Sequence, residues 1–150
     1  RGFGGAQISH VIYHFEEIIK PYEPKAIVFF CGTNDLTALK TPKETINDFK
    51  KFLSLVRNEF GNIKVYVISI KPSVDRFYLD KEERIFNSSI KLLASRDAYL
   101  EYINVWDSML DEDGSRMPEL FIEDGLHMNK KGYEVWTKQV RKSLSKDFNI

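Results

Sequence analysis

Apolar residues along this chain follow two different spacings. In residues 7–20 they fall three or four positions apart, which predicts one amphipathic helix. Similar spacing predicts helices over residues 41–61, 81–96 and 129–147, and short apolar runs predict strands at residues 26–31, 65–70 and 102–106. Strands that alternate with helices favour a parallel sheet covered by helices on both faces. The run at residues 26–31 is therefore expected to be buried on both faces.

The helix predicted from residue 41 has clear start and stop signals. Thr41 is a good N-cap, Pro42 suits the first helical position, and Glu44 can complete a capping box. Gly61 is suited to the end of the same helix, and Pro21 is expected to end the preceding one.

Composition and charge narrow the class of protein. With 150 residues, of which 43% are hydrophobic, the chain has enough apolar material for one core and is predicted to form a single domain. The 22 basic and 22 acidic side chains cancel, so charge provides no attraction to nucleic acid or an anionic membrane. No apolar run is long enough to span a membrane. The single cysteine, Cys31, lies in an apolar run and is expected to be a buried structural thiol.

Three short motifs carry candidate chemistry. His127 follows Asp124 by three residues, so the carboxylate can hold the imidazole in the tautomer of a general base. Asn34 comes directly after the predicted strand at 26–31, at the edge where open α/β sheets place their ligands. Its amide and the unobstructed backbone N–H of Gly5 are candidate donors to an oxyanion.

These motifs resemble the SGNH hydrolases, also called the GDSL lipase and acylhydrolase family, from Arg1 to the last predicted helix. Gly5 matches the glycine of the second family block, Asn34 the asparagine of the third, and Asp124 with His127 the Asp-x-x-His of the fifth. The first block, which carries the nucleophilic serine, does not occur in this chain. The resemblance is specific because of the order and spacing of the blocks.

The resemblance implies an α/β fold: a three-layer α/β/α, flavodoxin-like sheet of parallel strands whose first strand is missing from this chain. Residues 1–150 are then a single SGNH hydrolase-like domain that is incomplete at the N-terminus. Removing an inner strand exposes unpaired backbone, so we expect a complementing N-terminal segment or a swapped homo-oligomer.

The function implied by the resemblance is that of a serine esterase or acylhydrolase that cleaves a small-molecule ester substrate, either a simple one or one of carbohydrate or lipid type. A serine upstream of this chain would form the acyl-enzyme, His127 would be the base and Asp124 its orienter, and Gly5 and Asn34 would form the oxyanion hole. No metal or organic cofactor is required, and this chain alone is expected to be inactive. The loop over residues 71–78 is expected to shape the substrate pocket.

Other interpretations of the sequence stay open. The chain can be a non-catalytic ligand-binding domain on the same scaffold. His10 and His14 have the spacing of metal ligands on a helix, which would suit a metal-dependent hydrolase, although no further cysteine or histidine supports them. Ser69 is the least implausible internal nucleophile, and residues 113–115 are interpreted as a turn. The sequence does not indicate a cellular location.

Overall fold

The computed structural model describes residues 2–150, and Arg1, the first residue of the predicted domain, lies outside them. Within the described residues the sheet has three parallel strands in the order β1-β2-β3. They are β1 (Ala26–Phe29), β2 (Lys64–Ile68) and β3 (Leu100–Ile103). β1 pairs only with β2, so its other edge carries no strand from residues 2–150.

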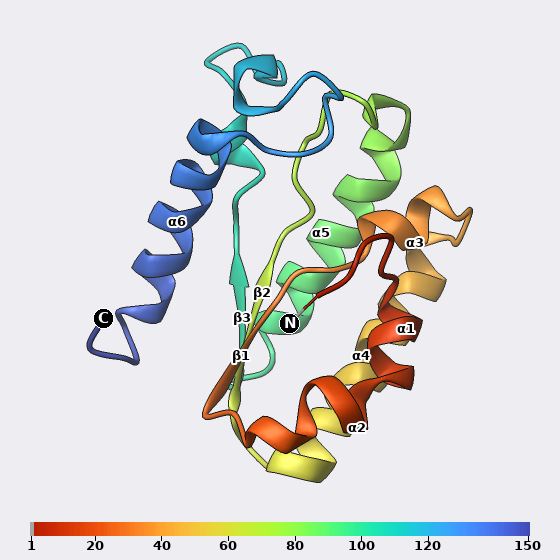
Figure 1. The fold of residues 1–150 in the computed structure, drawn as a ribbon, viewed down its shortest axis with the longest axis vertical. Coiled ribbons are helices and arrows are strands. Elements are labelled where there is room, and N and C mark those ends of the chain that lie inside the picture. Colours follow the sequence, from red (N-terminus) through yellow and green to blue (C-terminus); the bar gives the residue numbers. More distant parts are fainter. Residues whose placement is uncertain (1) are drawn as a thin grey trace.

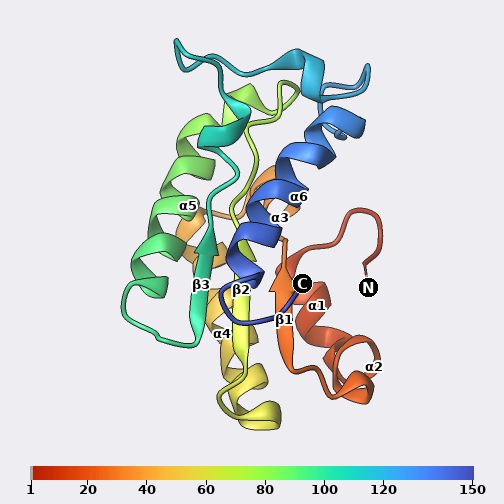
Figure 2. The same ribbon diagram turned by 90° about the vertical axis from the view of Figure 1, so that its left-hand side faces the viewer.

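Helices flank this sheet on both faces (Figure 1). One face is covered by α4 (Pro42–Phe60) and α5 (Asp80–Ala94), and the other by α6 (Lys130–Leu144), which crosses in front of the sheet in Figure 2. The shorter helices α1 (Ile8–Tyr13) and α2 (Phe15–Ile18) lie beside β1, and α3 (Thr33–Thr37) contacts α4 and α5. This arrangement confirms the prediction of an α/β fold with a parallel sheet between helical layers.

The apolar positions of the helices form separate cores on the two faces of the sheet. Toward α4, the rings of Phe29 and Phe52 stack with their centroids 4.3 Å apart. Toward α6, the buried side chains of Tyr66 and Ile103 pack against Trp136. A smaller cluster of buried side chains in the loops before α6 packs against Val135 and Trp136 of that helix. Its members are Met109, Leu120, Phe121 and Met128. The last cluster fixes the loop that carries Asp124 and His127.

Several predicted elements differ from the structure in their bounds, and two of these differences have an identifiable local cause. The helix predicted over residues 7–20 is divided into α1 and α2, because the backbone of His14 leaves helical geometry with φ −92° and ψ 12°. The strand predicted at residues 102–106 begins at Leu100 and ends at Ile103. It ends early because the backbone N–H groups of Val105 and Trp106 donate to the hydroxyl of Ser69.

The expectation that the first predicted strand is buried on both faces is wrong. Val28 is 44% exposed and Phe30 is 37% exposed, because β1 lies at the edge of the sheet and α6 covers mainly its neighbours. The predicted cap of α4 is confirmed: the Thr41 hydroxyl accepts from the backbone of Glu44, whose carboxylate accepts from the backbone of Thr41. Among residues 2–150, no helix has the length and apolar character needed to cross a membrane.

Candidate active site

Asp124 and His127 form a direct pair in the loop before α6. Oδ2 of Asp124 lies 2.6 Å from Nδ1 of His127, and Oδ1 accepts the backbone N–H groups of Leu126 and His127 at 2.8 Å each. These hydrogen bonds, led by that from the His127 ring, lower the pKa of Asp124 to about 2. The imidazole is 72% exposed, and its Nε2 atom has no hydrogen-bond partner among residues 2–150. The pair therefore presents a free ring nitrogen to an incoming group.

The backbone of this loop is held by short-range hydrogen bonds. The N–H of Ile122 donates to the carbonyl of His127 at 2.9 Å, and the N–H of Gly125 donates back to Ile122 at 3.0 Å. Gly125 has a φ of +63°, which favours glycine. The Asn129 amide donates to the carbonyls of Glu119 and Phe121 while its oxygen caps α6. The loop is thus anchored at both ends.

Asn34 lies in the first turn of α3, a short helix that the sequence pattern did not predict. Its amide nitrogen donates to the carbonyl of Ala6 at 3.0 Å. This bond places the amide beside the carbonyl of the residue that follows Gly5, and Gly5 itself has a φ of +68°. The Gly5 N–H donates to no acceptor among residues 2–150. Asn34 is therefore hydrogen-bonded to the residue next to Gly5, although the two predicted oxyanion donors are 29 positions apart in the sequence.

The segment between β2 and α5 contacts both groups of candidate residues. Arg76 donates to Oδ1 of Asn34 from both terminal nitrogens, at 3.1 and 3.2 Å. The backbone N–H of the adjacent Asp75 donates to the carbonyl of Gly125 at 3.1 Å. One loop thus links the Asn34 amide to the turn that holds Asp124 and His127.

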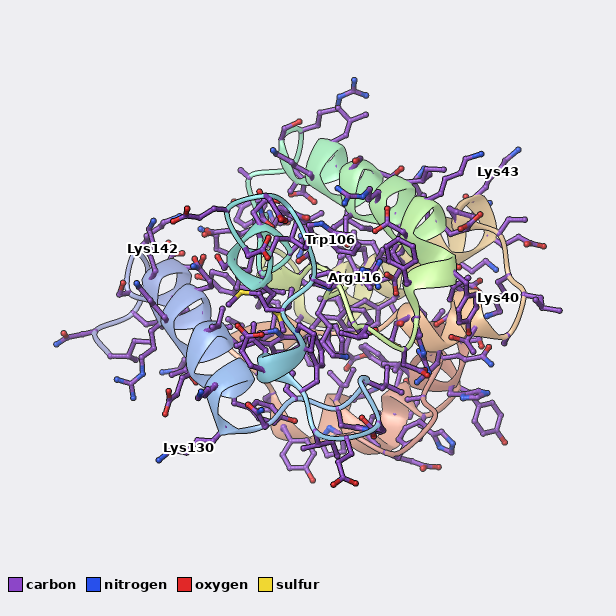
Figure 3. All side chains as sticks on the ribbon, turned by 90° about the horizontal axis from the view of Figure 1, so that it is seen from above. Lys40, Lys43, Trp106, Arg116, Lys130 and Lys142 are labelled. Atoms are coloured by element: carbon purple, nitrogen blue, oxygen red, sulfur yellow. The ribbon has the colours of Figure 1, made fainter. Side chains whose placement is uncertain are left out.

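Several charged side chains are buried beneath this loop. Burial raises the pKa of Glu83 to about 7, although Arg116 and Lys71 oppose the shift. Burial and the charge of Arg76 lower the pKa of Lys71 to about 8. Arg116, labelled in Figure 3, pairs with Asp80 at 2.7 Å and lies over the rings of Phe77 and Trp106. Among the positive charges of this cluster, that of Arg76 contacts Asn34 directly.

The residues of the other interpretations lie elsewhere or have structural partners. Nδ1 of His10 accepts from the backbone of Gln7, and Nδ1 of His14 contacts Glu17 at 3.1 Å. Within the part of the chain that the structure describes, no three acidic, histidine or cysteine side chains gather as metal ligands. Ser69 is 1% exposed and accepts two backbone N–H groups, so it is placed as a structural residue.

Two further expectations can be compared with the structure. Burial raises the pKa of the Cys31 thiol to about 12, as expected for a structural thiol and not for a reactive one. Residues 113–115 form the predicted turn, in which Gly114 has a φ of +84° and the Ser115 N–H donates to Asp111 and Asp113.

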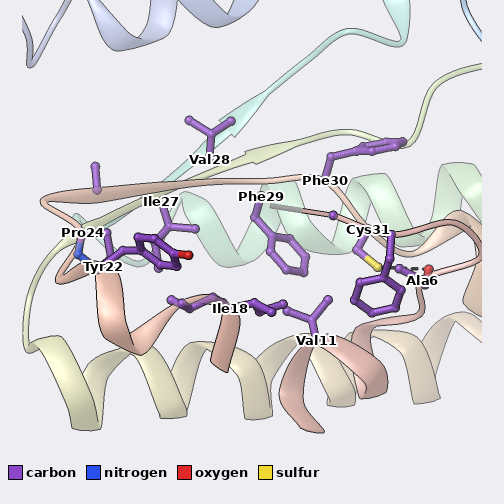
Figure 4. Close-up of a pocket in the computed structure, with 14 residues that line it drawn as sticks. Ala6, Val11, Ile18, Tyr22, Pro24, Ile27, Val28, Phe29, Phe30 and Cys31 are labelled. Carbon is purple, nitrogen blue, oxygen red and sulfur yellow. Dashed lines mark hydrogen bonds between the residues drawn. The ribbon is translucent and has the colours of Figure 1, made fainter. Parts of the chain in front are cut away.

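An apolar groove of about 570 Å³ runs along β1 on the side of α1 and α2. Figure 4 shows Phe29 and Ile27 facing Val11 and Ile18, while Val28 and Phe30 point to the opposite face of β1. The groove follows the strand edge that has no partner among residues 2–150. Backbone hydrogen-bonding groups and apolar side chains are therefore exposed along one line.

Comparisons with known proteins agree with this fold. Residues 1–135 match the GDSL-like lipase/acylhydrolase family, and the chain belongs to this family of esterases and acylhydrolases. A GDSL-like lipase from Bacteroides thetaiotaomicron has the same fold, with a TM-score of 0.83 at 22% identity over 99% of this chain and 75% of that one.

Two curated proteins are also similar in sequence. Isoamyl acetate-hydrolyzing esterase of Schizosaccharomyces pombe is 24% identical over 97% of this chain and 61% of its own length. N-acylneuraminate cytidylyltransferase of Escherichia coli O18:K1:H7 is 27% identical over 83% of this chain and 29% of its own length. This chain thus spans less than two thirds of the length of either relative.

Proposed function

We propose that this chain supplies the base, its orienting carboxylate and the oxyanion donors of a serine esterase or acylhydrolase. The observation that carries the proposal is the 2.6 Å contact between Asp124 and His127, with Nε2 of His127 left free among residues 2–150. The Asn34 amide, held by the carbonyl of Ala6 next to Gly5, supplies the complementary donor. Family membership supports ester hydrolysis as the reaction class.

The proposed reaction passes through an acyl-enzyme. A serine hydroxyl attacks the ester carbonyl carbon while Nε2 of His127 accepts its proton, and Asp124 stabilises the resulting imidazolium. The Gly5 N–H and the second N–H of the Asn34 amide, the one not bonded to Ala6, donate to the developing oxyanion. His127 then returns the proton to the leaving alcohol, and water repeats the sequence to release the acid.

We place the nucleophilic serine upstream of Arg1, on a strand that pairs with the free edge of β1. Among residues 2–150, no serine hydroxyl is hydrogen-bonded to His127. The open edge of β1 and the apolar groove beside it would receive such a strand through backbone hydrogen bonds and side-chain burial. The strand would end at the same edge of the sheet as Asn34, because parallel strands share their carboxyl ends.

Ester hydrolysis by the full-length protein, meaning the complete product of its gene, tests this function. Isoamyl acetate, after which the Schizosaccharomyces pombe relative is named, and p-nitrophenyl acetate are suitable small esters. Asn34→Ala should lower kcat by on the order of a hundredfold, the usual effect of losing one oxyanion donor. Asn47→Ala, on the exposed surface of α4, is the matched control and should leave turnover unchanged. A folded full-length protein that hydrolyses no ester would favour a non-catalytic ligand-binding domain.

A further inference from the structure

The Asn34 amide is held from both sides by groups of opposite hydrogen-bonding character. Arg76, a donor only, contacts Oδ1, and the carbonyl of Ala6, an acceptor only, contacts Nδ2. A flipped amide would bring N–H groups against the guanidinium and an oxygen against a carbonyl. The orientation of Asn34 is therefore determined by its partners.

Arg76 is an unusual residue to bury for this purpose. Arg76 is only 8% exposed, and its hydrogen bonds within residues 2–150 include no carboxylate. Its direct acceptors are neutral: Oδ1 of Asn34, and the Thr33 hydroxyl at 2.9 Å. The Thr33 hydroxyl in turn donates a hydrogen bond to Oε1 of Glu83 at 3.4 Å. The charge of Arg76 acts on Glu83 through space and not through a direct hydrogen bond, so burying this cation costs desolvation energy that its direct partners do not offset with opposite charge.

The guanidinium also acts on the chemistry of the amide. A positive charge bonded to Oδ1 draws electron density from the amide and strengthens its N–H groups as donors. The same charge is bonded to the amide that would face the oxyanion, and water screens it little because Arg76 is only 8% exposed. The second N–H of the Asn34 amide, which is not bonded to Ala6, would therefore be a stronger donor to the oxyanion.

We infer that Arg76 is a positioning residue of the esterase site, which orients and polarises the Asn34 amide for the oxyanion. This inference rests on the proposed function. The adjacent Asp75 also contacts the turn that carries Asp124 and His127, because its backbone N–H donates to the carbonyl of Gly125. A side chain on Gly125 would meet that nitrogen at 3.2 Å, so the turn and the loop are closely packed.

A double-mutant cycle separates this role from a general structural one. Arg76→Ala should lower kcat by roughly 10- to 100-fold with little change in KM, because the amide acts on the transition state. In an Asn34→Ala background the same change should cost less than about threefold, because residues that act through one another are not additive. Arg76→Lys should behave like Arg76→Ala, since an ammonium cannot reproduce the two-pronged contact. Guanidinium ion should partly restore Arg76→Ala, and not the double variant.

Arg116 provides the matched control. Its side chain is 7% exposed and donates to the carbonyl of Ser73 in the same loop, but it does not contact Asn34. Arg116→Lys should lower the melting temperature, and its effect on kcat should multiply with that of Asn34→Ala. If Arg76 behaves in this way too, its role is structural and the inference is wrong.

A second readout does not depend on turnover. In the full-length protein, NMR relaxation of the Asn34 side-chain amide should show an ordered group in the wild type and in Arg116→Lys, and a mobile one in Arg76→Ala. An amide that stays equally ordered in Arg76→Ala overturns the inference. If the wild type hydrolyses no ester, the proposed function fails, and the relaxation result still decides whether Arg76 holds Asn34.

Discussion

Asp124 holds His127 through both oxygens of one carboxylate, with Oδ2 on the ring nitrogen and Oδ1 on the backbone N–H. The orientation of the imidazole and the conformation of the turn therefore depend on the same side chain. Because the pKa of Asp124 is about 2, the carboxylate is ionised throughout the pH range of an ester assay.

This relationship makes Asp124→Asn more informative than Asp124→Ala. Asparagine keeps an oxygen for the backbone N–H groups of Leu126 and His127 but removes the negative charge facing Nδ1. We expect kcat of the full-length protein to fall by on the order of a thousandfold while the fold is kept. A loss below about tenfold would remove Asp124 from the proposed role.

His127→Ala should separate catalysis from folding. Turnover should fall at least about a hundredfold, the usual contribution of a general base. The melting temperature should change by no more than about 3 °C, because the ring is 72% exposed and packs against little. His10→Ala, at an exposed position of α1, is the control and should keep full activity. Retention of more than about a tenth of wild-type turnover in His127→Ala would identify another base.

Chelation tests the metal-dependent alternative directly. Exhaustive treatment of the full-length protein with EDTA should leave ester hydrolysis unchanged, because the proposed chemistry needs only a serine, His127 and hydrogen-bond donors. Loss of activity with EDTA and its recovery with zinc would contradict the proposal. His14→Ala would then be the first variant to test for metal binding.

Glu83 makes stability depend on pH in a specific direction. Burial raises the pKa of its carboxyl from the ordinary 4.5 to about 7, so the folded state binds a proton more tightly than the unfolded state. Its contribution to the free energy of unfolding is therefore present at low pH and is lost as the pH rises from about 4.5 to 7. Glutamine cannot ionise. As the pH rises from 5 to 8, the free energy of unfolding of Glu83→Gln should therefore increase by about 1 to 3 kcal/mol relative to that of the wild type.

Urea unfolding at several pH values measures this difference, with Glu134→Gln on the exposed face of α6 as the control. The control should follow the wild type at every pH. A Glu83→Gln curve that runs parallel to the wild type would mean that Glu83 is ionised in the fold.

Local sequence signals were sufficient for most of the fold. The cap formed by Thr41 and Glu44 predicted the start of α4, because the partners are three residues apart and need no tertiary context. The edge exposure of Val28 could not be predicted in this way, since it depends on which strands lie beside β1. The early end of β3 likewise depends on the hydroxyl of Ser69, a residue of a different segment.

The candidate site shows the same division. Asp124 and His127 could be paired from the sequence because one turn of the chain joins them. Asn34 was placed correctly after the first strand, but the short helix α3 that carries it has no periodic pattern of its own. Arg76 was missed as an individual residue, because its contact with Asn34 spans 42 positions. The only available signal was its place in the loop over residues 71–78, which was expected to border the site.

Labelling with a fluorophosphonate probe shows whether residues 1–150 hold every group of the proposed site except the nucleophile. The full-length protein should be labelled at a serine upstream of Arg1, and His127→Ala should abolish the reaction. Residues 1–150 alone should remain unlabelled, and adding the upstream segment should restore labelling and hydrolysis by several orders of magnitude. Stoichiometric labelling of residues 1–150 at Ser69 or another internal serine, or a folded full-length protein that neither labels nor hydrolyses esters, would contradict the account.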